Sequence, residues 1–241
     1  MSIEYLKTYR IEAKMEVMSG LHVGAGKDSV EIGGIDSPIV KHPHSLQPYI
    51  PGSSLKGKLR SILEWALQCI EDNGDVWGTQ TVRPGDVILR TFGTTAKNWK
   101  EGPTRLIVRD AQLCTEWRGK VTQQGLPLTE AKSEVSINRL QGKAASMGPR
   151  IMERVPAGAL FDVDLLFKRY SVEEDKLDLA CVNRVIEAMR LLEEDALGGS
   201  GSRGYGRVRF KTVRIDGEDI TAAFRSPWKF DKAAPQRFVK E

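Results

Sequence analysis

Residues 50–70, IPGSSLKGKLRSILEWALQCI, carry the clearest periodic pattern in the chain. Apolar side chains recur there at intervals of three and four, which places them on one face of a helix: Leu55, Leu59, Ile62, Leu63, Ala66, Leu67 and Ile70. Ser53 or Ser54 is expected to cap this helix, because a serine oxygen accepts a hydrogen bond from a free N–H group. The stretch therefore predicts an amphipathic helix that packs against a core.

Extended segments lie on both sides of this helix. Residues 8–18 alternate apolar and charged side chains, and LIVRDAQL, 106–113, is a second strand candidate. Residues 151–168 are expected to form a β-hairpin, with Pro156 and Gly158 as its turn residues.

The remainder of the chain completes a recognisable order of elements. A second helix is expected near 178–195 and a strand, RVRFKTVRI, at 207–215, so the chain has strand–helix–strand twice, the order of a ferredoxin-like α+β core. Residues 72–104 are rich in Gly, Thr and Asp, and we expect them to form an inserted lid outside the core. Residues 118–150 are polar and are expected to be weakly structured and functional. The whole chain, 1–241, is predicted to be one domain.

The composition excludes several classes of protein. Of 241 residues, 40% are hydrophobic and 28% charged, which is ordinary for a globular protein, and the net charge is only +4. No signal peptide is visible and there is no run of about 20 apolar residues, so we expect a cytoplasmic protein without a membrane partner. Three cysteines without a Cys-x-x-Cys motif argue against a disulfide framework and a cysteine zinc site.

The start of the predicted helix is unusually basic. Lys56, Lys58 and Arg60 occupy its first two turns, where the helix dipole favours anions by about 0.3–1 kcal/mol per charge. Such a cluster is expected where a phosphate binds, with the hydroxyls of Ser53 and Ser54 as further donors. The alternative is a solvated helix face with an ordinary serine cap.

A glycine-rich loop, GGSGSRGYGRV, spans 198–208. A helix precedes it and a strand follows, which is the reverse of the order that a dinucleotide-binding loop requires. Gly199 and Gly201 allow a backbone to approach a ligand closely, and Gly201 is expected to need a positive φ. Arg203 and Arg207 add positive charge. The loop predicts an anion-binding site, and a helix C-cap with a tight turn is the alternative.

Basic and apolar residues are interleaved through 132–154. The basic residues are Lys132, Arg139, Lys143, Arg150 and Arg154. Ile137, Leu140 and Ile151 lie between them. Apolar wedges among basic residues suit insertion between unstacked bases. A solvated loop is an equally supported alternative.

Asp36 and His22 both lie close to glycines. Asp36, in GGIDSPIV, 33–40, is either a catalytic carboxylate or a turn residue that bonds its own backbone. His22, in SGLHVGAG, is either functional or structural. No Ser-His-Asp or Cys-His arrangement can be placed. The residues alone therefore support an RNA- or phosphate-binding α+β domain and say little about catalysis.

Seven segments, taken in order, resemble the RAMP superfamily. They are SGLHVGAG, GGIDSPIV, YIPGSSLKGKLRSILE, RTFGT (90–94), EVSINR (134–139), PRIMERVPAGALF and GGSGSRGYGRV. The resemblance covers residues 8–210. IPGSSLKGKLR and the glycine-rich loop mark the superfamily, whereas GGIDSPIV and the spacing of INR and ERV point more narrowly to backbone subunits of type III-A, or Csm, CRISPR interference complexes.

The resemblance implies an RRM-like core whose copies stack into a helical filament along CRISPR RNA, together with the other subunits of the Csm complex. A thumb within residues 125–155 would wedge between bases at regular intervals. The residues implied as guide-RNA contacts are His22, Lys56, Arg60, Arg139 and Arg150.

The resemblance also implies cleavage of complementary single-stranded target RNA, with Asp36 and a divalent metal, Mg²⁺, at the catalytic site. Three alternatives stay open. The chain could be the backbone subunit of a type III-B complex, a scaffold that binds guide RNA without cutting, or a metal-free processing endonuclease that uses histidine as acid and base.

Overall fold

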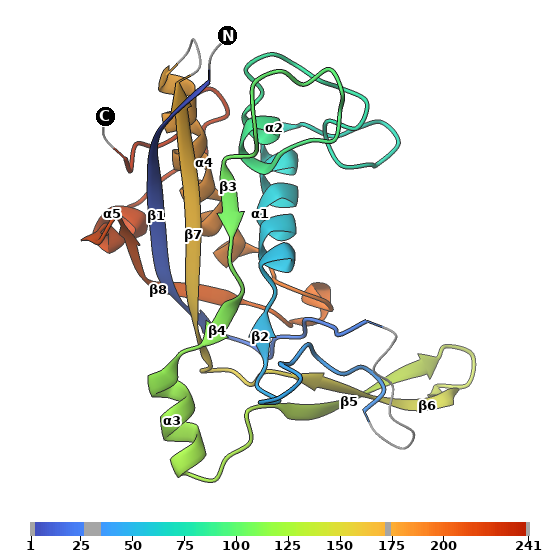
Figure 1. The fold of residues 1–241 in the computed structure, drawn as a ribbon. Coiled ribbons are helices and arrows are strands. Elements are labelled where there is room, and N and C mark those ends of the chain that lie inside the picture. Colours follow the sequence, from blue (N-terminus) through green and yellow to red (C-terminus); the bar gives the residue numbers. More distant parts are fainter. Residues whose placement is uncertain (1–2, 27–34, 172–174, 240–241) are drawn as a thin grey trace.

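One large antiparallel sheet organises the molecule (Figure 1). The computed structural model describes residues 3–26, 35–171 and 175–239. In this part of the chain a 7-stranded sheet has the order β2-β4-β7-β1-β8-β9, with β3 also pairing with β7. Its strands are β1 (Glu4–Val17), β2 (Tyr49–Ile50), β3 (Leu106–Val108), β4 (Ala111–Leu113), β7 (Leu160–Ser171), β8 (Val208–Ile215) and β9 (Glu218–Asp219). All of these pairings are antiparallel.

The central strands β1 and β7 each bury one face. Ile11 lies opposite Leu165 and Ala13 lies opposite Val163. All four side chains are buried, whereas the residues between them are charged or more exposed. This period of two is the geometry of a strand with one face on a core. It confirms the strand expected at 8–18.

Two helices provide the other half of the core (Figure 1). Helices α1 (Gly52–Leu67) and α4 (Asp175–Glu194) contact each other, and α4 also contacts β7 and β8. Their apolar side chains enter one cluster with the buried side chains of the sheet. Both helices confirm the predictions made from the apolar periodicity of the sequence. Among the described residues, no helix is long and apolar enough to cross a membrane.

The start of α1 differs from the expected serine cap. Pro51 occupies the N-cap position, and Ser53 and Ser54 lie inside the first turn. The N–H group of Gly52 instead donates to Oδ1 of Asp110 at 2.7 Å. A side chain on Gly52 would collide with the backbone of β3, so close packing requires glycine at this position.

Two strand assignments from the sequence need correction. The strand expected at 106–113 is two short strands, β3 and β4, and Asp110 lies between them and reaches α1. The hairpin expected at 151–168 is wrong. Its first half belongs to β6 (Lys143–Arg154), which pairs with β5 (Glu130–Asn138), whereas β7 pairs with β1. Alternation shows which face of a strand is buried but not which strand is its partner.

Residues 118–150 are more regular than expected. They contain most of α3 (Thr115–Gln123), then β5 and the first part of β6. Strands β5 and β6 form a separate two-stranded sheet, the β5–β6 hairpin, which projects from one end of the large sheet (Figure 1). No residue of β5 is buried. Its sequence does alternate, but the apolar residues Ala131, Val135 and Ile137 are on the exposed face, so the alternation does not mark a strand that covers a core.

Residues 72–104, which we call the lid segment, contribute to the core, contrary to the expectation that they lie outside it. The segment contains α2 (Val87–Phe92), which is capped by the side chain of Asp86. Its buried apolar side chains are Trp77, Ile88, Leu89 and Phe92. Composition hid this contribution because one short helix and an isolated tryptophan are surrounded by polar residues.

Buried ion pairs attach the lid segment to α4. Arg90 of α2 and the nearby Arg105 contact Asp178 of α4 at 3.2 and 3.4 Å. All three side chains are at most 3% exposed. Arg90 also pairs with Glu101 at 2.5 Å. Each charge is therefore compensated inside the protein rather than by water.

Residues 226–239 cover a second side of α4. The N–H group of Val239 donates to Oδ1 of Asn183 at 3.0 Å, and the N–H group of Gln236 donates to Oε1 of Glu187 at 2.8 Å. Asn183 and Glu187 are both buried. The sequence pattern assigns this segment no role, but it satisfies polar groups that the helix buries.

Candidate nucleic-acid interface

Asp36 is an exposed residue of a partly buried segment that runs alongside β6. Its Oδ2 accepts a hydrogen bond from the N–H group of Ile151 at 2.6 Å. The next residue, Ser37, accepts from the N–H group of Glu153 at 3.0 Å and donates to the carbonyl oxygen of Ile151 at 3.3 Å. The carboxylate thus binds a strand far away in sequence rather than its own turn. Gly33 and Gly34, the other part of this motif, lie outside the described residues.

Glu153 links this segment to β6 from within the protein. Its side chain is 2% exposed, its Oε2 accepts from the N–H group of Ile39 at 3.1 Å, and its Oε1 accepts from Nζ of Lys41. Burial alone would raise the pKa of Glu153, but the hydrogen bonds from Lys41 and Ile39 outweigh it and hold the pKa below its ordinary value. The role of Glu153 was not predicted from the sequence, since nothing in a local pattern shows that a strand glutamate is buried.

His22 joins the same group of residues. Its Nδ1 lies 2.7 Å from the carbonyl oxygen of Glu153, so Nδ1 carries a proton and donates it. The carbonyl oxygen of His22 accepts from the N–H group of Gly199 at 2.8 Å. His22 as a whole is 9% exposed. The structure therefore brings His22, Asp36 and Gly199 together around β6.

The glycine-rich loop is shaped by close packing. Gly198, Gly204 and Gly206 have positive φ, and a side chain on Gly198 would collide with the carbonyl oxygen of His22. The expectation of a positive φ at Gly201 is wrong, because Gly201 begins the short 3₁₀ helix η2 (Gly201–Arg203). Glycine is favoured there by space, since a Cβ would lie 2.7 Å from the Cβ of Ala196.

The same loop contacts the base of the β5–β6 hairpin. Nζ of Lys132 lies 4.5 Å, and the guanidinium carbon of Arg154 lies 5.0 Å, from the centre of the Tyr205 ring. Nε of Arg203 lies 3.4 Å from Oε2 of Glu134. Tyr205 was not singled out from the sequence, although it lies within the glycine motif. Arg207, also in this loop, is exposed.

The basic residues of α1 all have partners within the protein. Lys56 is half-buried, its Nζ donates to the carbonyl oxygen of Leu106 at 3.0 Å, and burial, with the charge of Arg60, lowers its pKa. Lys58 pairs with Asp195 at 2.7 Å. A phosphate at this helix would compete with these bonds, so the role of Lys56, Lys58 and Arg60, and of Ser53 and Ser54 beside them, stays a prediction.

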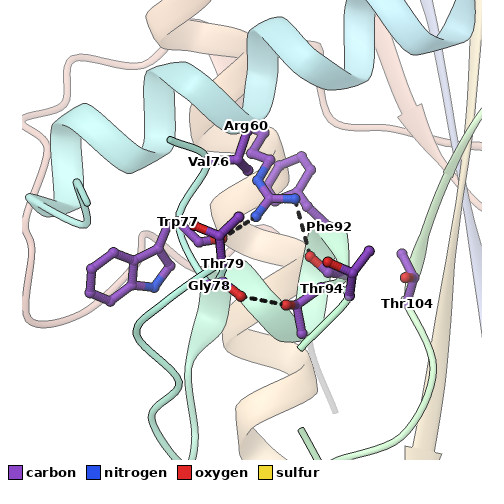
Figure 2. A pocket seen from close by; sticks show the side chains of 10 residues that line it. Arg60, Val76, Trp77, Gly78, Thr79, Phe92, Thr94 and Thr104 are labelled. Carbon is purple, nitrogen blue, oxygen red and sulfur yellow. Dashed lines mark hydrogen bonds between the residues drawn. The ribbon is translucent and has the colours of Figure 1, made fainter. Parts of the chain in front are cut away.

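Arg60 also lines a pocket of about 390 Å³ between α1 and the lid segment. Its guanidinium group donates to Glu64 at 2.8 Å and to the carbonyl oxygens of Gly93 and Trp77 at 3.1 and 2.5 Å. Figure 2 shows this group pointing toward the backbone of the lid segment, with the hydroxyl of Thr94 bonded to the carbonyl oxygen of Gly78 beside it. Arg60 therefore holds the lid segment against α1.

The β5–β6 hairpin presents apolar side chains to solvent. Val135 is 50% exposed, Ile137 is 56% exposed and Leu140 is 99% exposed. Arg139 and Arg150 are exposed on the same hairpin, and Arg139 donates to the carbonyl oxygen of Ile137 at 3.0 Å. Apolar side chains beside arginines form a surface that could enter a base stack and neutralise phosphates.

A metal would find few protein ligands here. Within residues 3–26, 35–171 and 175–239 there is no group of three or more His, Cys, Asp or Glu side chains placed to hold a metal ion. Asp36 can supply one carboxylate. This donor set fits a Mg²⁺ ion that keeps several waters and takes phosphate oxygens as ligands, and it does not fit a closed protein site.

Known proteins resemble this chain over most of its length. The model of the RAMP superfamily matches residues 14–209. A CRISPR system Cms endoribonuclease, Csm3, from Methanothermobacter thermautotrophicus is 38% identical over 229 residues, which covers 88% of this chain and 87% of that protein. The protein of the same name from Enterococcus italicus is 40% identical over 207 residues, with 86% and 91% covered.

A solved structure agrees with these relatives. The crystal structure of a Csm3–Csm4 subcomplex from the type III-A CRISPR-Cas interference complex matches with a TM-score of 0.52 and 26% identity, covering 94% of this chain and 86% of the other. Residues 14–209, which the RAMP superfamily model matches, include the glycine-rich loop, α1 and the β5–β6 hairpin described above. This chain belongs to the RAMP superfamily and, within it, to the Csm3 family.

Proposed function

We propose that this protein is the backbone subunit of a type III-A CRISPR effector complex, which binds CRISPR RNA as a filament of copies and cuts complementary target RNA. The contact between Asp36 and β6 is the observation that carries the proposal. It places an exposed carboxylate at the base of a hairpin with apolar and basic side chains. The Csm3 relatives, which are named endoribonucleases, support the type III-A assignment over a type III-B one.

The fold supports an RRM-like core. Strands β4, β7, β1 and β8 are adjacent in that order, α1 follows β1 and α4 follows β7. This is the order of a ferredoxin-like βαββαβ unit, with β3 and β4 together as its second strand. On this assignment the β5–β6 hairpin is an inserted thumb, and the lid segment is a second insertion.

The RNA path follows the surfaces described above. The glycine-rich loop, with Arg203 and Arg207, and the start of α1 would bind the phosphates of the guide. The hairpin would insert Ile137 or Leu140 between bases, which unstacks them and bends the backbone. Since phosphate contacts carry no sequence information, base pairing between guide and target supplies the specificity.

Cleavage would use the bend that the hairpin introduces. A splayed nucleotide brings its 2′-OH or a water molecule into line with the scissile phosphate. The carboxylate of Asp36 would accept the proton of the attacking hydroxyl or hold a hydrated cation at that phosphate, and the phosphate would release the oxygen of the next nucleotide. Mg²⁺, when bound through phosphate oxygens and water, supplies charge neutralisation at the phosphoryl oxygens. The N–H group of Ile151 fixes the orientation of the carboxylate.

The test is target cleavage by the reconstituted complex. With wild-type protein and Mg²⁺, labelled complementary RNA should give a regular ladder, and EDTA should abolish it. Asp36→Ala should remove the ladder and leave guide and target affinity unchanged, whereas the exposed carboxylate variant Asp231→Ala should cut normally.

Other outcomes identify the alternatives. If the wild-type complex binds RNA but gives no cleavage ladder, the protein is a scaffold that binds guide RNA without cutting. Cutting in EDTA favours a histidine-based processing enzyme. Co-purification with a type III-B large subunit would reassign the complex.

A further inference from the structure

Glu153 contacts two segments that are far from it in sequence, residues 37–41 and His22. Its carboxylate receives the N–H group of Ile39 at 3.1 Å and Nζ of Lys41, and its carbonyl oxygen receives Nδ1 of His22 at 2.7 Å. Its own N–H group donates to the carbonyl oxygen of Ser37 at 3.0 Å. Ser37, Ile39 and Lys41 follow Asp36 in the chain, and His22 is hydrogen-bonded to Gly199 of the glycine-rich loop.

These bonds fix the register between the Asp36 segment and β6. Backbone bonds on Ser37 and the bond from Ile151 to Asp36 pair the two segments like neighbouring strands. The described residues of the two segments form only a few such bonds, and backbone bonds alone repeat along a strand, so they do not exclude a slipped pairing. The side chain of Glu153 excludes a slipped pairing, because it accepts hydrogen bonds from the N–H group of Ile39 and from the ammonium group of Lys41.

We infer that Glu153 is a positioning residue for RNA cleavage, which holds the carboxylate of Asp36 at one register on the hairpin strand β6. The inference rests on the proposed function and deepens it. The hairpin sets which nucleotide is splayed, and Asp36 lies beside the scissile phosphate. A slip by one residue would move Asp36 by about 3.3 Å along the strand. Glu153 therefore determines how far the cut lies from the splayed nucleotide.

Two substitutions separate positioning from folding. Glu153→Gln keeps the size of the side chain and one acceptor for Ile39, but loses the charge that faces Lys41. Glu153→Ala loses both contacts. We expect target cleavage at saturating RNA to fall in the order wild type, Gln, Ala, by roughly 100-fold for Ala. The cuts should also spread to neighbouring linkages, while guide and target affinity stay within about 2-fold of wild type.

Glu71 provides the matched control. It is another buried glutamate, and it accepts N–H groups from Gly78, Gln80 and Thr81 in the lid segment at 2.9–3.1 Å. Glu71→Gln should lower the thermal midpoint without moving or spreading the cuts. If the Glu153 variants keep the wild-type cut positions and rate, or if Glu71→Gln spreads the cuts equally, the inference is overturned.

Amide hydrogen exchange tests the role of Glu153 independently of RNA cleavage. In the isolated full-length chain, Glu153→Gln and Glu153→Ala should speed exchange at residues 35–41, most of all at Ile39, and Glu71→Gln should not. Unchanged exchange at Ile39 overturns the inference, including for a variant that fails to assemble. A wild-type complex that binds RNA but never cuts it would instead refute the proposed function, and the exchange result would still show whether Glu153 holds Asp36.

Discussion

The lid segment lies between α1 and β3 and the β5–β6 hairpin lies between α3 and β7, and the two regions are held in opposite ways. The lid segment buries Trp77, Ile88, Leu89 and Phe92 in the core. The hairpin instead exposes Val135, Ile137 and Leu140 and is attached through polar contacts at its base. Exposed apolar side chains that gather in one place mark an interaction surface. The lid segment is therefore part of the folded core, and the hairpin carries a surface suited to binding another molecule.

Charge is treated differently in the two regions as well. Arg90 and Arg105, at the lid segment, are buried on one aspartate of α4. Arg139 and Arg150, on the hairpin, are exposed. Arginine therefore stabilises the fold at the lid segment, and on the hairpin it is exposed to solvent.

The largest effect should come from Asp178→Ala. It leaves two buried arginines without their shared carboxylate, which should reduce the free energy of unfolding by about 3–5 kcal/mol. Urea denaturation measures this loss, with Asp231→Ala as the exposed control, which should stay within about 0.5 kcal/mol of wild type. A loss below about 1 kcal/mol would mean that the lid segment is not held by these charges.

Arg60→Ala should have the next largest effect on stability. It leaves two carbonyl oxygens of the lid segment without their arginine donor, and Glu64 keeps the N–H group of Trp77, so the expected cost is about 2 kcal/mol. Lys58→Ala, on the same helix, loses only a partly exposed ion pair and should cost about 0.5 kcal/mol or less. If both residues also contact phosphates, each variant reduces the salt slope of RNA binding by about 0.7. Equal stabilities would contradict the different roles that the structure gives them.

Changes on the hairpin should affect RNA binding and not stability. The double variant Ile137→Ser, Leu140→Ser should weaken RNA binding by the assembled complex about 10-fold, equivalent to about 1.4 kcal/mol. Thermal unfolding of the isolated chain should stay within about 0.5 kcal/mol of wild type. Val76→Ser, at an exposed apolar residue of the lid segment, is the control and should leave binding unchanged. A lower free energy of unfolding in the hairpin variant would show that Ile137 and Leu140 stabilise the fold, as the apolar residues of the lid segment do.

The last expected effect is the pH dependence of the lid segment, which appears only at acid pH. The N–H group of Thr81, with further N–H groups of the same turn, lowers the pKa of Glu71 to about 2 from an ordinary value of 4.5. A lowered carboxyl pKa stabilises the folded state above the unfolded-state value, and this stabilisation is lost as the pH falls from 4.5 toward 2. Glu71→Gln should remove this part of the acid dependence in a series of denaturation curves. A variant with the wild-type acid profile would contradict it.

Periodicity predicted the parts of the fold that face one core. Helices α1 and α4 and strand β1 follow directly from spacing, because each buries one continuous stripe. The hairpin expected at 151–168 failed because the partner of a strand depends on contacts far away in sequence. The lid segment was misjudged because the six residues of α2 are too few for a periodic signal.

The candidate site was predicted in part. Asp36, His22 and Gly199 came from motifs, and the structure places them around one strand. Glu153 and Tyr205 were missed, because the burial of a polar side chain is decided by tertiary contacts. The basic cluster of α1 was found from sequence, but its bonds to Leu106 and Asp195 could not be foreseen.

The cover that residues 226–239 provide for α4 has a consequence for biosynthesis. The ribosome makes α4 before it makes this segment, so Asn183 and Glu187 stay hydrated in the nascent chain until their partners emerge. The sheet and the lid segment can therefore begin to fold during translation, but α4 completes its packing only after residue 239 has left the exit tunnel. A stop codon introduced just before residue 226 should accordingly give a chain that chaperones retain, even though every strand of the sheet is present.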